Sequence, residues 1–280
     1  MALPRRRSAI HIHILLLFLS LITALLYRPS SSPSSFHPGS SHQKILLLTA
    51  HPDDECLFFS PTILALRESV YSMCISTGNS EGLGEVRKEE LGRSLDVLGV
   101  EAERRVVLDH PDLQDNITVS WNAQVLSDVV GPFVVANDID IILTFDQGGI
   151  SGHPNHIALP DAMEHMLTQT TSETRLYTLV TVPLPSKYIS ILAPILARLR
   201  LLLLEGPAIF SSFAGSLKTS DLEGKTPTPT PTPIVFIAGI DEYLTALRAM
   251  RQHWSQLVWF RWLNVMFSRY MWVNEWVEIV

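Results

Sequence analysis

Six stretches of this chain are almost continuously apolar and about as long as β-strands. They cover residues 44–49, 71–77, 104–108, 139–145, 176–182 and 234–238. Strands without polar alternation are buried on both faces, as they are in parallel sheets. The pattern therefore favours a sheet that helices cover on both sides.

Segments with a helical spacing of apolar residues separate these strands. They cover residues 62–69, 85–98, 120–136 and 154–168. Ser60 and Pro61 are expected to cap and begin the first helix. Strands that alternate with helices predict a Rossmann-like, doubly wound α/β fold with a mainly parallel sheet. We expect one domain over residues 44–280.

The N-terminus differs from the rest of the chain. Arg5, Arg6 and Arg7 precede an apolar run over residues 10–27, equivalent to about 27 Å of helix and close to the thickness of a thin bilayer. Residues 1–28 are therefore predicted to form an N-terminal transmembrane helix, with a cleaved signal peptide as the alternative. The three arginines favour a domain on the lumenal side by the positive-inside rule.

Three further segments interrupt the alternation of strands and helices. Residues 29–43 are rich in Ser and Pro and predict a flexible tether, and the Thr-Pro repeat within 218–233 predicts a surface insertion. Residues 188–204 are apolar but contain one proline and two arginines. They predict either a helix at a membrane interface or a buried helix.

Composition limits the possible functions. The formal net charge of -7 argues against a protein whose main task is to bind nucleic acid, because that task requires a basic face. Cys56 and Cys74 lie in apolar surroundings, so we predict two buried thiols and no disulfide framework.

The first polar cluster follows the first strand and reads His51-Pro52-Asp53-Asp54-Glu55. Open α/β sheets bind ligands at the carboxyl ends of their strands, where this cluster is expected to lie. Carboxylates crowded at one site need a cation, and His with Asp suits zinc. The alternative is a solvated loop before a helix.

The second cluster follows the strand at 139–145 and extends from Asp146 to His156. Its glycines allow a tight loop, and Pro154 favours the first helical position, which makes His153 the cap and places His156 over the same face. A helix N-terminus keeps a histidine neutral and able to bind metal.

Together the two clusters predict a catalytic metal site. His51, Asp54 and His156 would be the ligands and leave a position open for water. Asp53 would be the general base, and His153 would stabilise the oxyanion or protonate the leaving amine. Zn²⁺ is the expected cofactor, although such ligands also suit iron or manganese.

With both clusters in view, the chain resembles the LmbE-like (PIG-L) zinc deacetylases from about residue 44 to the C-terminus. Further motifs at 77–91, 253–256 and 267–271 support the resemblance. It implies the roles given above for the ligands, base and acid, and it adds two residues near the substrate, Arg87 and Asp112. The alternative for Arg87 is an exposed helix face on which it pairs with Glu90.

The resemblance also implies a substrate and a location. The expected reaction removes the N-acetyl group of N-acetylglucosaminyl-phosphatidylinositol, a glycolipid, in GPI-anchor synthesis at the cytoplasmic face of the endoplasmic reticulum membrane. This conflicts with the positive-inside rule, and glycosylation of Asn116 in the sequon at 116–118 would indicate a lumenal domain. The alternatives are a deacetylase of another sugar conjugate and a non-catalytic membrane scaffold.

The C-terminal segment is rich in aromatic residues. Its tryptophans are Trp254, Trp259, Trp262, Trp272 and Trp276. With Arg261 and Arg269 they favour a surface at the level of lipid headgroups. The alternative is a helix that packs its tryptophans into the core.

Overall fold

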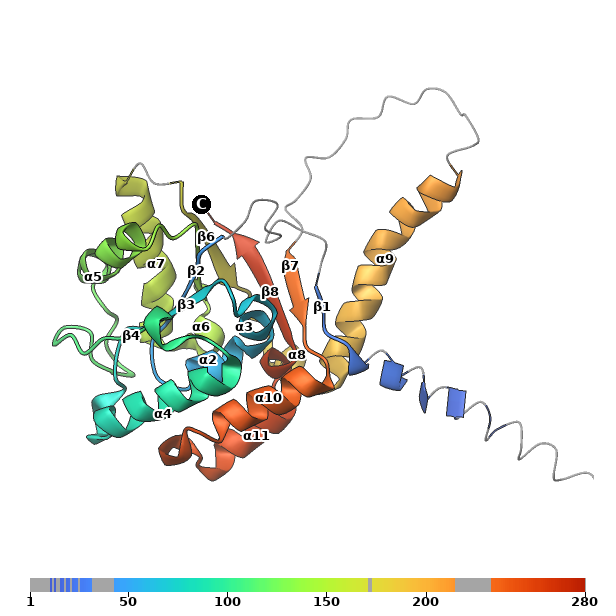
Figure 1. The fold of residues 1–280 in the computed structure, drawn as a ribbon, viewed down its shortest axis with the longest axis horizontal. Coiled ribbons are helices and arrows are strands. Elements are labelled where there is room, and N and C mark those ends of the chain that lie inside the picture. The colour runs from blue at the N-terminus through green and yellow to red at the C-terminus, as the bar shows by residue number, and fades with distance from the viewer. Residues whose placement is uncertain are drawn as a thin grey trace, which may run out of the picture.

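The computed structural model describes residues 43–170, 173–214 and 233–279 and part of 11–31, with only the backbone for 204–214. These residues form one eight-stranded sheet in the order β1-β7-β8-β6-β5-β2-β3-β4, with helices around it (Figure 1).

Five strands form the parallel part of the sheet, in the order β4-β3-β2-β5-β6. They are β2 (Ile45–Thr49), β3 (Val70–Cys74), β4 (Arg105–Val107), β5 (Ile141–Phe145) and β6 (Arg175–Leu179). Ile45 of β2 pairs with Val70 on one side and Ile141 on the other. The chain thus builds outward from β2 in both directions, and the predicted doubly wound, mainly parallel sheet is confirmed.

Three antiparallel strands complete the sheet: β8 (Val273–Glu278), β7 (Ile234–Ile237) and β1 (Ser30–Ser31). Asn274 and Glu275 interrupt the apolar pattern of β8, and this strand was not predicted. Trp276 of β8 is fully buried and stacks on Phe59, with ring centroids 5.8 Å apart. For Trp276, and for the buried Trp272, packing in the core is therefore the correct alternative.

Helices cover both faces of the sheet. One face carries α5 (Ala123–Ala136) and α7 (Pro154–Gln169), and the other carries α3 (Ser60–Leu66), α4 (Gly84–Leu98) and α10 (Ile240–Met250). Short helices α2 (Asp54–Phe58), α6 (Gly149–Gly152) and α8 (Leu184–Lys187) lie in the connections, with 3-10 turns at Asn79–Glu81, Ala102–Arg104, Trp254–Gln256 and Arg269–Met271.

Two local predictions have different outcomes. Ser60 is not the cap of α3 but its first residue, because its hydroxyl donates to the carbonyl of Cys56 in the preceding turn at 2.9 Å. Cys56 and Cys74 are buried free thiols, as predicted, and burial raises the pKa of both well above the ordinary value.

The segment predicted over 188–204 is mostly helix α9 (Leu192–Ala214). Pro194 lies in the first turn, where the missing N–H breaks no helical hydrogen bond, so it does not interrupt the helix. Ala193 and Ala197 face inward and are buried, whereas the leucines on the opposite side are exposed. α9 packs beside β7 and β8.

The predicted anchor over 1–28 lies largely outside the described residues, as does the insertion over 218–233. No helix within the described residues combines the length and the apolarity that a membrane crossing requires. Ser30 and Ser31, at the start of the predicted tether, pair with β7 as an edge strand, and the guanidinium of Arg198 donates to the carbonyl of Arg28.

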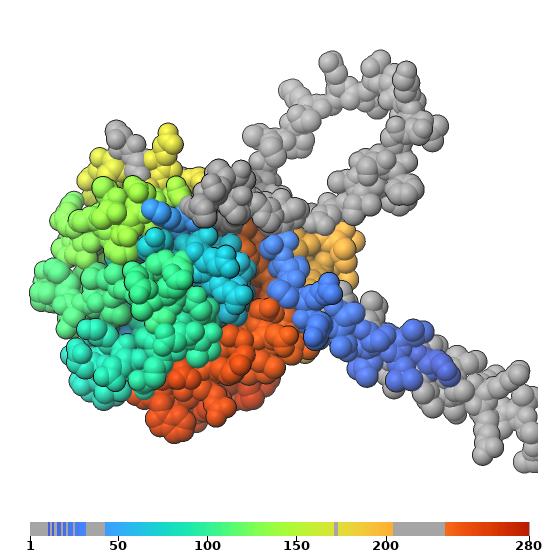
Figure 2. Space-filling model, viewed as in Figure 1, coloured from blue at the N-terminus to red at the C-terminus, as the bar shows by residue number. Residues whose placement is uncertain are grey.

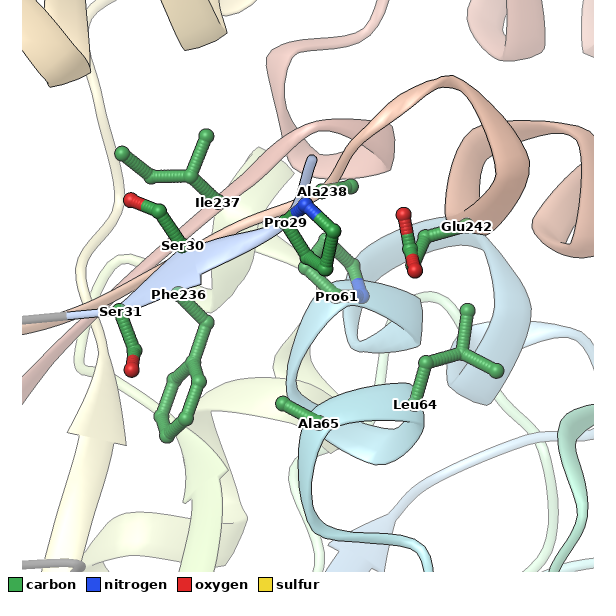
Figure 3. A pocket seen from close by; sticks show the side chains of 10 residues that line it. All are labelled: Pro29, Ser30, Ser31, Pro61, Leu64, Ala65, Phe236, Ile237, Ala238 and Glu242. Atoms are coloured by element: carbon green, nitrogen blue, oxygen red, sulfur yellow. The ribbon is translucent and has the colours of Figure 1, made fainter. Parts of the chain in front are cut away.

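A pocket of about 200 Å³ lies where β1 meets α3, β7 and α10 (Figure 3). Its walls are mainly apolar, and its acidic group, Glu242, accepts a hydrogen bond from the N–H of Gly239 at 2.9 Å. That carboxylate therefore caps α10, and the pocket contains none of the predicted site residues.

Candidate metal-dependent active site

The strand order reverses between β2 and β5, and both predicted clusters lie there. After β2 the chain passes to the face of α3, and after β5 it passes to the opposite face. The carboxyl ends of these two strands are therefore the topological switch point, where open α/β sheets bind ligands. The structure brings His51 and His156 together at this point, with ring centroids 5.4 Å apart.

Asp54 lies between these two histidines as the first residue of α2. Its Oδ2 accepts hydrogen bonds from the N–H groups of Ala50 and His51 at 3.0 and 2.9 Å. Oδ1 lies 3.3 Å from Nε2 of His156, and Oδ2 lies 3.9 Å from Nδ1 of His51. Burial alone would raise the pKa of Asp54, but the two histidines outweigh it and hold this pKa below its ordinary value.

The other ring nitrogen of each histidine is already engaged. Nδ1 of His156 donates to the carbonyl of Gly149 at 3.1 Å, and Nε2 of His51 lies 3.1 Å from Oδ1 of Asn155 and 3.2 Å from Oδ1 of Asp115. The remaining nitrogens, Nε2 of His156 and Nδ1 of His51, therefore face Asp54. Metal-binding histidines are oriented in this way by partners on the outer nitrogen.

The loop that holds His156 has an unusual backbone. Gly149 has φ +52°, and an added Cβ there would lie 2.9 Å from Cγ1 of Ile157. Ile150 also has a positive φ of 62°, which is unfavourable for a β-branched residue. The resulting bend aims the carbonyl of Gly149 at His156 instead of continuing α6 into α7.

His153 caps α7 as predicted. Its Nδ1 accepts a hydrogen bond from the N–H of Asn155 at 3.3 Å, so the neutral ring carries its proton on Nε2. Burial and the neighbouring His51 and His156 lower the pKa of His153 to about 4. One nitrogen from each of the three histidines lies within 4.8 Å of the others, so the geometry offers a second ligand set, His51, His153 and His156.

Asp53 lies beside this cluster in a strained conformation. Its φ is 105°, in the left-handed region, and its side chain is almost fully buried. Oδ2 lies 2.9 Å from Nη2 of Arg261 in α11 (Trp259–Phe267), an ion pair without the angle of a hydrogen bond. Burial raises the pKa of Asp53, and Arg261 opposes part of that increase.

The buried carboxylate of Glu55 helps to position Asp53. Glu55 accepts a hydrogen bond from the N–H of Asp53 at 3.0 Å, and its carboxylate also contacts Nε2 of His253 at 2.7 Å and the hydroxyl of Ser94 at 2.5 Å. Glu55, Cys56 and His253 lie close enough to hold a metal. The short contact between Glu55 and His253 and the raised pKa of the Cys56 thiol favour an ion pair there instead.

The predicted substrate residues have different surroundings. Arg87 is 7% exposed and donates to the carbonyls of Gly78 and Pro52, both at 2.8 Å. The alternative that it pairs with Glu90 on an exposed helix face is therefore wrong, since Glu90 is buried too and accepts from Ser255.

Asp112 lies on the exposed part of the loop over 109–122, where its N–H donates to Nδ1 of His110. The carboxylate of this loop that reaches the site is Asp115, which contacts Arg87 at 3.5 Å and His51 at 3.2 Å. Asn155 fixes the same loop by donating to the carbonyl of Val119. No feature of the sequence distinguishes Asp115 from the other aspartates of the loop.

Arg261 and His253 were also not assigned to the site from the sequence. His253 belongs to the motif at 253–256, which is a signal that could have identified it. In the sequence Arg261 is a basic residue among tryptophans, and no spacing relates it to Asp53.

The fold and the cluster define a doubly wound α/β protein with a candidate metal centre at the carboxyl ends of β2 and β5. A deacetylase of the teicoplanin biosynthetic pathway is similar over 85% of this chain and 99% of that one, with a TM-score of 0.54 and 13% identity. The N,N'-diacetylchitobiose deacetylase of Pyrococcus horikoshii is similar over 94% of this chain and 91% of that one, with a TM-score of 0.51 and 15% identity. At these identities the likeness shows the fold.

Sequence similarity identifies the family. The family model described as GlcNAc-PI de-N-acetylase matches residues 46–167. The N-acetylglucosaminyl-phosphatidylinositol de-N-acetylase of Bos taurus is 36% identical over 243 residues, which cover 85% of this chain and 84% of that protein. The chain belongs to the PIG-L family.

Proposed function

We propose that this protein hydrolyses the N-acetyl group of N-acetylglucosaminyl-phosphatidylinositol and releases glucosaminyl-phosphatidylinositol and acetate. The name of the Bos taurus relative, whose sequence aligns with most of this chain, supports the substrate. The observation that carries the reaction is the convergence of His51, Asp54 and His156, with their outer hydrogen-bonding positions already occupied.

The donor set fits a divalent cation. Two neutral imidazole nitrogens and one ionised carboxylate oxygen are ligands that zinc accepts, and iron or manganese accepts them too. Asp54 stays ionised because its pKa is held low. A bound cation would polarise the acetamide carbonyl and lower the pKa of a water molecule. We propose His51, Asp54 and His156 as its ligands and Zn²⁺ as the cation.

Asp53 is proposed as the general base. Its raised pKa moves this carboxylate toward the range in which a base works near neutral pH. The proton that Asp53 takes from the attacking water is the one that the leaving amine requires, so Asp53 can return it as the C–N bond breaks.

His153 is proposed to stabilise the oxyanion. Because its pKa is lowered to about 4, the ring is neutral at physiological pH and its Nε2–H acts as a hydrogen-bond donor. This favours the oxyanion role over delivery of a proton from an imidazolium. We also propose that Arg87 and Asp112 contact the substrate.

The proposed location is the cytoplasmic face of the endoplasmic reticulum membrane.

The test is acetate release from synthetic GlcNAc-phosphatidylinositol by the full chain, with and without a chelator. Asp53→Asn should keep the metal and lose about 10²–10⁴-fold in kcat, since it removes a general base. Asparagine tolerates the left-handed backbone at this position, so the variant is expected to fold. Full activity of metal-loaded Asp53→Asn would remove Asp53 from the mechanism, and acetate release from soluble N-acetyl sugar conjugates alone would favour the alternative substrate class.

A further inference from the structure

Helix α11 exposes most of its apolar side chains. Trp259 is 74% exposed, Phe260, Leu263 and Phe267 are exposed as well, and Val265 is buried toward the domain. In Figure 2 the red and orange C-terminal segment forms the lower edge of the molecule. A helix with this much exposed aromatic surface is typical of an interaction site.

The exposed surface continues into the neighbouring segment. Ser190 donates from its N–H to the carbonyl of Phe267 at 2.9 Å and from its hydroxyl to the carbonyl of Met266 at 2.6 Å. These hydrogen bonds join the connection between α8 and α9 to the end of α11. That connection and α9 expose further apolar side chains, namely Tyr188, Ile191, Leu192, Leu196, Leu199, Leu202 and Leu203.

Charge near this surface favours an anionic partner. Residues 243–274 contain four arginines and no Asp or Glu. Arg261 pairs with Asp53 and Arg269 pairs with Glu275, so Arg248 and Arg251 are the two that present positive charge to solvent. The exposed Arg248 and Arg251, together with Leu244 and Trp262, line a groove of about 490 Å³ beside α11, which Asp241 also lines. Aromatic and leucine side chains next to arginines are the combination that a bilayer with anionic headgroups binds.

The same helix contacts the active site. Arg261 on the inner side of α11 lies 2.9 Å from Asp53. A bilayer on the outer side of α11 would therefore lie about 10 Å, one helix diameter, from the proposed base. A sugar attached to a membrane lipid could reach Asp53 over this distance while the lipid stays in the bilayer.

We infer that α11, the connection over 188–191 and the leucine side of α9 form one surface that rests on an anionic phospholipid bilayer at the active-site mouth. The functional reason for this membrane contact rests on the proposed glycolipid substrate. The surface itself is argued from exposure, contiguity and charge.

Tryptophan quenching tests the surface in the full chain. The protein is reconstituted in vesicles of phosphatidylcholine and phosphatidylserine with bromine atoms on the upper acyl chain. The predicted anchor over 1–28 contains no tryptophan, so quenching reports on the domain. Trp254, Trp259 and Trp262 are exposed, whereas Trp121, Trp272 and Trp276 are buried. Replacing the first three by Phe should abolish the quenching, and Trp272→Phe should preserve it.

An activity comparison uses a matched pair of variants. Trp259→Glu should reduce acetate release from bilayer-borne substrate by roughly tenfold, because a charge replaces an exposed aromatic ring that the bilayer would bury. Acetate release from a monomeric short-chain analogue should stay the same. Val135→Glu on α5, where Val135 is also 74% exposed, should change neither activity.

The outcomes separate this inference from the proposed function. Absent quenching, or equal losses on both substrates, in a protein that cleaves the short-chain analogue would overturn the membrane surface and leave the deacetylase intact. Quenching at the three exposed tryptophans, with no acetate from either substrate, would support the surface and contradict the proposed function.

Discussion

Two regions of the molecule contribute to the site in different ways. Residues 46–167, the part that the family model matches, supply the proposed ligands, base and oxyanion donor. Residues 233–279 supply Arg261 and His253, which contact the carboxylates of Asp53 and Glu55. The first region thus provides the groups that would face a substrate, and the second sets the charge and position of those groups.

The difference follows from topology. Parallel strands end at one edge of the sheet, so the polar residues after β2 and β5 must meet there. The antiparallel strands β7 and β8 are instead connected through α10 and α11, which lie beside that edge of the sheet. These helices contact the cluster from the side, and α11 bears the exposed apolar surface. Changes in the first region should therefore abolish the reaction, and changes in the second should tune it.

The largest expected effect is in the first region. Asp54→Asn removes the proposed carboxylate ligand and should lower both metal affinity and activity by more than about 100-fold, the upper range seen for changes around metal ligands. Metal content by elemental analysis after dialysis, together with acetate release, measures this.

His153→Asn is the comparison variant for the ligand set. It should keep the metal and lose activity if His51, Asp54 and His156 are the ligands. If His153→Asn loses the metal and Asp54→Asn retains it, the three-histidine set is the correct one, and Asp54 belongs with the groups that only position others.

The same two regions differ in how far the sequence predicts them. Continuous apolar runs of strand length such as Ile45–Thr49 and Ile141–Phe145 favour strands buried on both faces, so the sequence predicts the approximate positions of the parallel strands. It does not predict their order in the sheet. β8 begins Val273-Asn274-Glu275, and Asn274 is buried because it bonds Thr62 and Phe58 from a distant part of the chain. The local sequence around Asn274 does not indicate these distant hydrogen-bond partners.

The site shows the same limit. The clusters around His51 and His156 could be paired because each follows a strand, and the cap role of His153 could be predicted from Pro154. Asp115 lies 64 residues after His51, and Arg261 lies 208 residues after Asp53, so their contacts with the cluster depend on how a loop and a C-terminal helix fold back onto it. Residues that meet over such long separations have no characteristic spacing that a sequence pattern could reveal.

A smaller effect is expected in the C-terminal region, residues 233–279. His253→Leu leaves Glu55 buried without its cation and should lower the free energy of unfolding by about 3 kcal/mol near pH 6. The pKa of His253 is raised above its ordinary 6.5 by Glu55 against the effect of burial, and the pKa of Glu55 is lowered below its ordinary 4.5. Both contributions are therefore fully present between about pH 4.5 and 6.5.

Above that window the difference between wild type and His253→Leu should shrink as His253 loses its proton in the folded state, and below it the difference should shrink as Glu55 gains one. Urea unfolding at several pH values measures this. His165→Leu, at a partly exposed position on α7, should stay within about 0.5 kcal/mol of wild type at every pH. A difference for His253→Leu that does not vary with pH would mean that packing, and not the charge pair, stabilises this region.

The smallest expected effect concerns Arg261, where the two regions touch. Its guanidinium lowers the pKa of Asp53, so Arg261→Gln should raise that pKa further and move the acid limb of the kcat profile to higher pH. The Arg261 side chain is 27% exposed, and solvent screening should keep the shift small. Activity should fall several-fold on the acid side and approach wild type on the alkaline side, whereas the exposed Arg251→Gln should leave the profile unchanged. A uniform loss at all pH values would indicate that Arg261 holds α11 in place, and an unchanged profile would show that the ionisation controlling the reaction is not that of Asp53.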